Sequence, residues 1–212
     1  MPLSQPGAEP VETLPAAGPA GDAQTAQSVE PAASGVATAG VLVAGCALLV
    51  LRPNLLRATS SPVLLLVAVF SFVGMVGAWW PLPSAGRGSG GVSAGMAVAV
   101  GVGGFALGRT IGGGHSPGPL TLHVVILNSL AAVAEEAFFR RLTYAVLNSG
   151  GAAWATAGSA LLFALVHLAT YGSWVLPIDV AAGLILGWQR WATGSWRVPA
   201  VTHVLANLLV VI

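Results

Sequence analysis

The sequence predicts an all-α fold, a polytopic bundle of transmembrane helices, on three observations. Hydrophobic residues make up 55% of the 212 residues and charged residues only 7%, whereas soluble domains carry about 25% charged residues. Apolar stretches close to the length that a helix needs to cross a bilayer recur along the chain. Short polar or glycine- and proline-rich segments separate these stretches. We therefore expect a multi-pass integral membrane protein, and the net charge of +1 predicts no nucleic-acid partner.

Residues 1–34 differ from the rest of the chain in composition. They are rich in Ala, Pro, Gly, Ser and Gln, and their only charged side chains are acidic. Such a segment cannot bury enough apolar surface to offset the entropy of the chain, so we predict a disordered acidic tail. It has no basic stretch followed by an apolar one, so we do not expect a signal peptide. The transmembrane domain is predicted to occupy residues 35–212.

Seven apolar stretches in that domain approach the roughly 20 residues of a spanning helix. They are residues 35–51, 62–82, 91–111, 120–147, 151–171, 174–191 and 195–212. The turn Arg52-Pro53-Asn54 is predicted to end the first stretch, and a loop of glycine and proline around His115 follows the third. Pro177 lies inside the sixth stretch, where it either kinks the helix or marks its first turn.

A few small or polar residues within the stretches have structural interpretations. Gly183 and Gly187 have the small-xxx-small spacing that lets two helix backbones approach closely in lipid. Asp179 is interpreted as an acid in the first turn of a helix, where the helix dipole favours a negative charge. His123 is expected at the membrane interface. Cys46, the single cysteine, is expected to be a small buried hydrophobic residue.

Four charged residues lie close together between Glu135 and Arg141, inside the fourth apolar stretch. An ionisable group at the centre of a bilayer costs about 2.5–3.5 kcal/mol, so such residues usually face the interior of a bundle and serve a function. Glu136 and Arg140 are four positions apart with the acid first, the favourable order for an ion pair within a helix. Glu135 has no such partner on its own helix, so we predict that it is the acid available for chemistry.

Polar residues in two later stretches complete a candidate site. His167 follows Phe163 by four residues and Asn207 follows His203 by four, so each pair shares one helix face. A carboxylate and an imidazole can activate a water molecule, and an imidazole and an amide can donate hydrogen bonds to an oxyanion. These groups are the parts of a peptide hydrolase that works inside the membrane. The alternative is structural, with histidines satisfied in the core and the charges forming an ion-pair network.

Three short motifs resemble those of a known family. The segments EEAFFR at 135–140, FALVH at 163–167 and HVLAN at 203–207 fit the motifs EExxxR, FxxxH and HxxxN. In this order on successive apolar stretches, residues 120–212 resemble the CPBP intramembrane proteases, which include CAAX prenyl endopeptidases and the bacterial Abi proteins. The resemblance implies a bacterial plasma-membrane protease with lipid and a membrane-associated, CAAX-type peptide or protein substrate as its partners.

The resemblance also implies roles for individual residues. Glu135 would be the catalytic base that activates water together with His167. His203 and Asn207 would stabilise the oxyanion that forms on the substrate.

The resemblance also concerns two supporting residues and a possible metal ion. By resemblance, Glu136 and Arg140 would support the geometry of the site. The family has been interpreted both as metal-free glutamate proteases and as metalloproteases. In the second case Glu135, His167 and His203 would bind a zinc ion. The sequence contains no HExxH segment, and we favour the mechanism without a metal.

Two other classes of function remain open at the level of sequence. An ion- or proton-coupled transporter would use Glu135, His167 and His203 as a relay. Such transporters often contain internal repeats, and we find no convincing repeat here. A non-catalytic immunity or scaffold protein of the same fold is the other alternative, which an incomplete set of motifs would have favoured.

Overall fold

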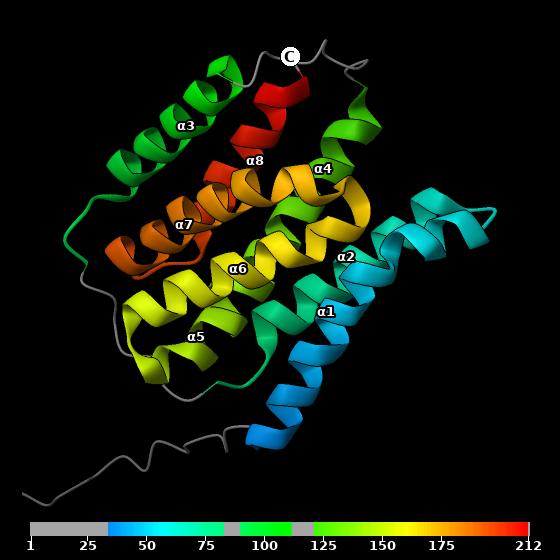
Figure 1. Cartoon of the computed structure of the whole chain (residues 1–212), viewed down its shortest axis with the longest axis horizontal. Coiled ribbons are helices and arrows are strands. Elements are labelled where there is room, and N and C mark those ends of the chain that lie inside the picture. The colour runs from blue at the N-terminus through cyan, green and yellow to red at the C-terminus, as the bar shows by residue number, and fades with distance from the viewer. Residues whose placement is uncertain (1–33, 83–89, 112–120, 212) are drawn as a thin grey trace, which may run out of the picture. The chain divides into compact units, whose positions relative to one another are not determined.

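The computed structural model describes residues 34–82, 90–111 and 121–211, and all regular elements in these residues are helical. Seven long helices follow one another along the chain (Figure 1). They are α1 (Gly35–Ala58), α2 (Pro62–Trp79), α3 (Ala94–Ile111), α4 (Leu122–Glu136), α6 (Ala152–Tyr171), α7 (Leu176–Thr193) and α8 (Arg197–Val211). The shorter elements are η1 (Ala137–Thr143), α5 (Tyr144–Leu147), η2 (Asn148–Gly150) and η3 (Ser173–Val175). The predicted all-α bundle is confirmed.

The ends of several helices follow from single residues. The hydroxyl of Ser34 accepts a hydrogen bond from the backbone N–H of Ala37 and so caps the N-terminus of α1. Pro62 begins α2, where its missing N–H has no partner to lose. Gly194 ends α7 in the left-handed conformation, with φ of 70°. Pro177 lies in the first turn of α7. Of the two predicted alternatives, a kink or a first-turn position, the second is therefore correct.

The predicted end of the first helix at residue 51 is wrong. Helix α1 continues through Arg52 and Pro53 to Ala58. A proline inside a helix removes one backbone hydrogen bond, but packing of the segment on its neighbours can outweigh that loss. Here the Arg52 side chain is buried and its Nη2 donates a hydrogen bond to the Thr170 hydroxyl of α6 over 3.1 Å. Arg52 therefore lies inside the bundle, where the sequence predicted a turn.

The fourth apolar stretch is not one regular α-helix. After α4 the backbone becomes a π-helix, η1, before it continues as α5 and the 3-10 turn η2. A π-helix has wider turns and is rare, because its hydrogen bonds join residues five apart. Side chains support its carbonyl groups: the Thr143 hydroxyl donates to the carbonyl of Phe138, and Arg190 of α7 donates to that of Arg140. A side chain of α7 thus contributes a hydrogen bond to the π-helix.

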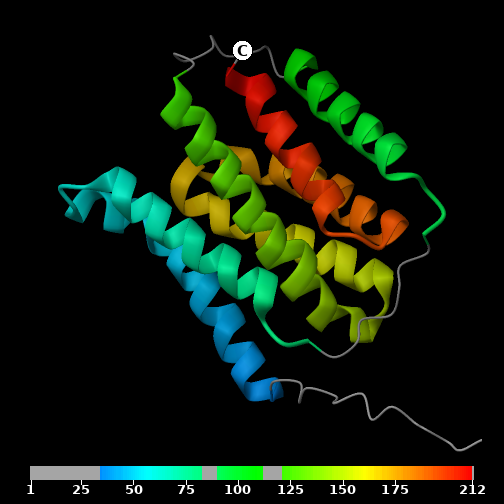
Figure 2. The same ribbon diagram turned by 180° about the vertical axis from the view of Figure 1, so that it is seen from behind.

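Glycines allow the central helices to pack closely. A Cβ atom on Gly183 would lie 2.8 Å from the Cα of Ala160, and one on Gly187 would lie 2.9 Å from a side-chain carbon of Thr156. The predicted close approach at these two glycines is confirmed, with α6 as the partner of α7 (Figure 1). Seen from behind, α4 lies between α2 and α8 (Figure 2). The segment that carries the charged residues is therefore central.

The buried side-chain amide of Gln189 connects helices α3, α7 and α8. The Nε2 group of Gln189 in α7 donates hydrogen bonds to the backbone carbonyl of Ala97 in α3 and to the hydroxyl of Thr202 in α8. Both bonds are short, at 2.7 and 2.9 Å, and the glutamine is fully buried. Such hydrogen bonds between helices are valuable in lipid, where backbone groups find no water.

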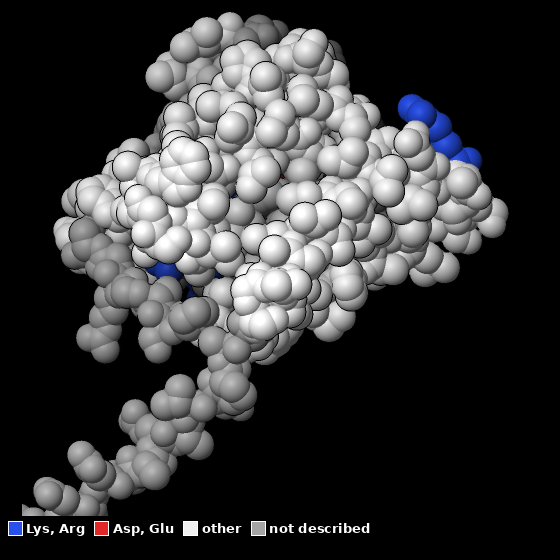
Figure 3. Space-filling view, turned by 60° about the horizontal axis from the view of Figure 1, so that its bottom comes forward, with Lys and Arg blue, Asp and Glu red and all other residues white. Residues whose placement is uncertain are grey.

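Five helical stretches in the described part of the chain are long and apolar enough to cross a membrane. They are Gly35–Ala58, Pro62–Trp79, Ala94–Ile111, Leu122–Gly150 and Ala152–Tyr171. The outer surface agrees, because large apolar side chains such as Leu64, Ile111 and Leu122 are more than two-thirds exposed. Figure 3 shows a face formed almost entirely by uncharged residues. The described residues of all seven predicted spans are largely helical, and five helical stretches meet these criteria.

The remaining expectations from sequence fall at the edges of the described residues. The predicted tail, residues 1–34, lies outside them except for Ser34, and so does His115. His123 is exposed at the start of α4, 3.4 Å from the Thr121 hydroxyl. Cys46 is partly buried beside the apolar core.

Replacement of Gly77 by alanine is expected to destabilise the protein. A Cβ atom at Gly77 would lie 2.5 Å from backbone atoms of Ala137 and Phe138, which belong to η1 and cannot rotate away. Overpacking of this kind costs about 1–3 kcal/mol. Thermal unfolding in detergent should show a lower midpoint for Gly77→Ala. The control is Gly103→Ala in α3, where nothing lies within 4 Å of the added methyl group, and a decrease of the same size there would contradict the explanation.

Candidate active site

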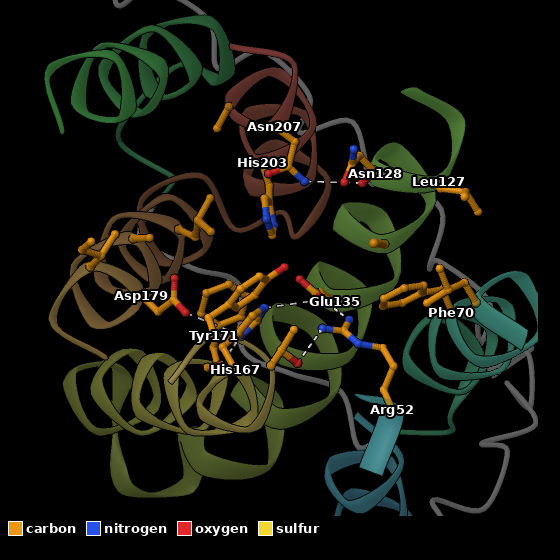
Figure 4. A pocket seen from close by; sticks show the side chains of 18 of the residues that line it. Arg52, Phe70, Leu127, Asn128, Glu135, His167, Tyr171, Asp179, His203 and Asn207 are labelled. Atoms are coloured by element: carbon orange, nitrogen blue, oxygen red, sulfur yellow. Dashed lines mark hydrogen bonds and ion pairs between the residues drawn. The ribbon is translucent and has the colours of Figure 1, made fainter. Parts of the chain in front are cut away.

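One pocket of about 480 Å³ is lined by polar side chains from several helices (Figure 4). Its polar lining residues come from five helices: Arg52 of α1, Asn128 and Glu135 of α4, His167, Thr170 and Tyr171 of α6, Asp179 of α7, and His203 and Asn207 of α8. Most of its other lining residues are apolar. The four residues that sequence analysis chose as catalytic candidates therefore share one cavity, although they lie on three helices.

Glu135 lies at the end of α4 and its carboxylate is directed into the pocket (Figure 4). Its Oε1 atom lies 3.8 Å from Nε2 of His167 and 3.9 Å from Nη1 of Arg52. Both distances exceed that of a direct hydrogen bond. The expectation that Glu135 lacks a partner on its own helix holds, but the acid is not unpaired, because α1 supplies a guanidinium.

His167 has one ring nitrogen whose hydrogen-bonding role follows from its partner. Its Nδ1 atom lies 2.7 Å from the backbone carbonyl of Phe163, one turn earlier in α6. A carbonyl oxygen can only accept, so Nδ1 carries the hydrogen. In the neutral ring Nε2 then has a free lone pair, and this is the atom that faces Glu135. The ring also stacks on Tyr171, with centroids 5.8 Å apart, which fixes its orientation.

Asp179 is the second acid of the pocket, a position that the sequence did not predict. It lies in the first turn of α7, as expected, but its Oδ2 atom is also 3.9 Å from Nδ1 of His167. That oxygen is buried and has no hydrogen-bond partner among the described residues. The only sequence signal was an acid within an apolar stretch, and no motif connected it to His167.

Glu136 and Arg140 lie behind the pocket and are completely buried. The Nε atom of Arg140 is 3.3 Å from Oε2 of Glu136, so the predicted ion pair is confirmed. The contact is an ion pair without a well-aligned hydrogen bond, since neither of these two atoms has a hydrogen-bond partner among the described residues. The guanidinium also lies over the ring of Phe163 at 4.8 Å, which stabilises its charge.

His203 is held by the same buried acid. Its Nδ1 atom lies 3.0 Å from Oε1 of Glu136, and a carboxylate accepts, so Nδ1 donates this hydrogen bond. The other ring nitrogen is left for the pocket, which His203 lines. One turn later Asn207 donates from Nδ2 to the backbone carbonyl of Asn128 over 3.4 Å. The face shared by His203 and Asn207 therefore lies opposite α4 (Figure 4).

Glu135, His167 and His203 were the candidates for metal ligands. Among the residues that the structure describes, no group of three or more His, Cys, Asp or Glu side chains is arranged to hold a metal ion. The Nδ1 atoms of both rings are occupied by hydrogen bonds to Phe163 and Glu136, so in each ring Nε2 is the nitrogen left for the pocket. In the described residues, Glu135, His167 and His203 therefore do not form a three-ligand metal site.

Comparison with known proteins identifies the segment that carries most of this site. Residues 117–209, slightly less than half of the chain, match a family model described as Type II CAAX prenyl endopeptidase Rce1-like. No curated protein and no solved structure matches the chain. All three motifs lie within the matched residues. Residues 117–209 are therefore similar to the Rce1-like family of CAAX prenyl endopeptidases.

Proposed function

We propose that this protein is an intramembrane endopeptidase in which Glu135 and His167 activate the water that attacks the substrate. One observation carries the proposal: the Glu135 carboxylate and Nε2 of His167 face each other at 3.8 Å across a pocket that His203 and Asn207 also line. The match of residues 117–209 to the Rce1-like family model supports the reaction class. Five membrane-spanning candidates support a reaction that takes place within the bilayer.

The proposed activation of water follows from the hydrogen-bonding capacities of the two groups. The carboxylate is an acceptor, and Nε2 of His167 is an acceptor in the neutral ring because Nδ1 holds the hydrogen. Two acceptors 3.8 Å apart are suited to share one water molecule, which donates a hydrogen bond to each. Glu135 then takes a proton from that water as the oxygen attacks the peptide carbonyl. Glu135 can then give this proton to the nitrogen of the leaving amine when the peptide C–N bond breaks.

The proposed oxyanion site is on α8. The tetrahedral intermediate carries a negative charge on the former carbonyl oxygen, and donors directed at that position lower the barrier. The Asn207 amide is one donor. His203 donates from Nε2 when its ring is protonated, and the positive charge of the ring is then balanced by Glu136, which accepts from Nδ1. Glu136 and Arg140 thus act through His203, in agreement with the supporting role that the motif implies.

The proposed substrate is a membrane-associated peptide or protein of the CAAX type. The family name supports this class, and so do the apolar side chains of the pocket, among them Leu66, Phe70 and Phe105. The partners are then the surrounding lipid and the substrate, and the protein is a multi-pass membrane protein. The bacterial plasma membrane inferred from the sequence stays a prediction.

The Glu135→Gln variant tests the central assignment. The amide keeps the shape of the side chain but cannot take a proton from water, so kcat for a CAAX-type reporter peptide should fall by about 10²–10⁴-fold. The measurement is cleavage of the peptide by purified protein in detergent or vesicles. An unchanged melting temperature would show that the fold survives. Activity equal to that of the wild type would disprove the role of Glu135.

Variants of the proposed oxyanion site should act on the chemical step. We expect Asn207→Ala to lower kcat by about 10²–10³-fold with a small change in KM, because the lost hydrogen bond matters most in the transition state. Steady-state kinetics on the same peptide measures both constants. A higher KM with unchanged kcat would instead show that Asn207 binds the substrate.

Removal of metal ions should leave the activity in place. The described donors do not form a three-ligand site, and the proposed water is activated by Glu135 and His167 alone. Protein dialysed against a strong zinc chelator is expected to keep its wild-type kcat. Loss of activity that added zinc restores would favour the metalloprotease interpretation of Glu135, His167 and His203.

A further inference from the structure

Arg52 is the one described residue of the pocket that carries a permanent positive charge. It lies in α1, outside the residues that match the family. Its side chain is only 10% exposed. A charged group buried to this extent usually has a partner or a function.

The guanidinium is held on three sides. Nη2 donates to the Thr170 hydroxyl of α6 over 3.1 Å, the ring of Phe70 from α2 lies 5.2 Å from its central carbon, and Nη1 is 3.9 Å from Oε1 of Glu135. Two of these contacts restrict the movement of the arginine, and the third directs its charge at the carboxylate. In Figure 4 the side chain extends from α1 toward Glu135.

The geometry points to Arg52 as a positioning residue that holds the Glu135 carboxylate in place opposite His167. The Oε1 atom that faces Arg52 at 3.9 Å is the same atom that faces Nε2 of His167 at 3.8 Å. The attraction between unlike charges is stronger in a protein interior than in bulk water. It favours the rotamer of Glu135 that directs this oxygen toward the histidine.

Other charged and titratable groups also surround Glu135, and the attraction to Arg52 acts together with them. His167 of α6 and His203 of α8 line the same pocket, and Arg140 lies on the following turn of its own helix segment. Asp179 of α7 adds a second carboxylate near His167. Two acids in one pocket repel each other, and Arg52 offsets that repulsion on the side of Glu135.

A competing role for Arg52 is direct binding of an anionic group of the substrate, such as a free C-terminal carboxylate. The structure favours the positioning role, because most of the guanidinium is already covered by Thr170, Phe70 and Glu135. A carboxylate bound there would also lie close to Glu135 and be repelled by it.

The test compares Arg52→Gln, Arg52→Lys and the control Arg57→Gln on the reporter peptide. Arg57 is in the same helix but is exposed and bonds only to Asn54 within the described residues. We expect Arg52→Gln to lower kcat about tenfold or more with little change in KM. Arg52→Lys, which keeps the charge, should retain more activity than the glutamine variant. The Arg57 variant should match the wild type.

A second measurement covers the case in which Arg52→Gln does not fold. Thr170→Val keeps the size of the side chain and removes the acceptor that restrains Arg52, and it should lower kcat several-fold. Melting temperatures identify variants that have lost the fold. Wild-type kcat in Thr170→Val would then overturn the inference.

The substrate is offered in two forms, with a free C-terminal carboxylate and with a C-terminal amide. Positioning of Glu135 predicts the same loss of kcat for both forms. A rise in KM that occurs only for the free acid would overturn the inference and assign Arg52 to substrate binding. The inference depends on the proposed function, but the two can fail separately. Wild-type kcat in Arg52→Gln together with loss of activity in Glu135→Gln refutes only the role of Arg52, whereas no cleavage by the wild type refutes both.

Discussion

A buried carboxylate shared between two cationic or proton-donating groups determines how this site is built. Glu136 is fully buried, and its two oxygens face Nε of Arg140 in η1 and Nδ1 of His203 in α8. In a bundle surrounded by lipid such an acid must be paired, because no water can solvate it. The pairing ties the C-terminal helix to the central segment. The position of His203 in the pocket, and of Asn207 on the same face, follows from this contact.

Two consecutive acids have different surroundings because they lie on a helix. Neighbouring residues are about 100° apart around a helix axis, so Glu136 turns into the core when Glu135 turns into the pocket. The core acid holds α8, and the pocket acid faces Arg52 and His167. The π-helix that begins right after them contains Arg140, and π-helical segments are frequent at functional sites. The backbone carbonyl of Arg140 accepts a hydrogen bond from Arg190, so α7 also contacts the segment that carries the two acids.

The site extends beyond the part of the chain that matches the family. Helices α4, α6, α7 and α8 supply the four candidates for catalysis and Asp179, all within residues 117–209. Helices α1, α2 and α3 supply Arg52, Phe70 and Phe105 to the same pocket. The N-terminal helices therefore close the cavity and add a charge to it. A fragment limited to the matched residues would lack this wall.

Sequence alone determined the features that depend on residues close together in the chain. The helical spans follow from the length of apolar stretches, and the pair of Glu136 and Arg140 follows from a spacing of four. The candidate site follows from polar residues repeated on single helix faces. Tertiary structure decided which of these faces meet. It placed Arg52 inside the bundle despite Pro53, converted part of the fourth stretch to a π-helix and brought Asp179 to His167. These outcomes depend on contacts between residues far apart in the chain, and no local pattern encodes them.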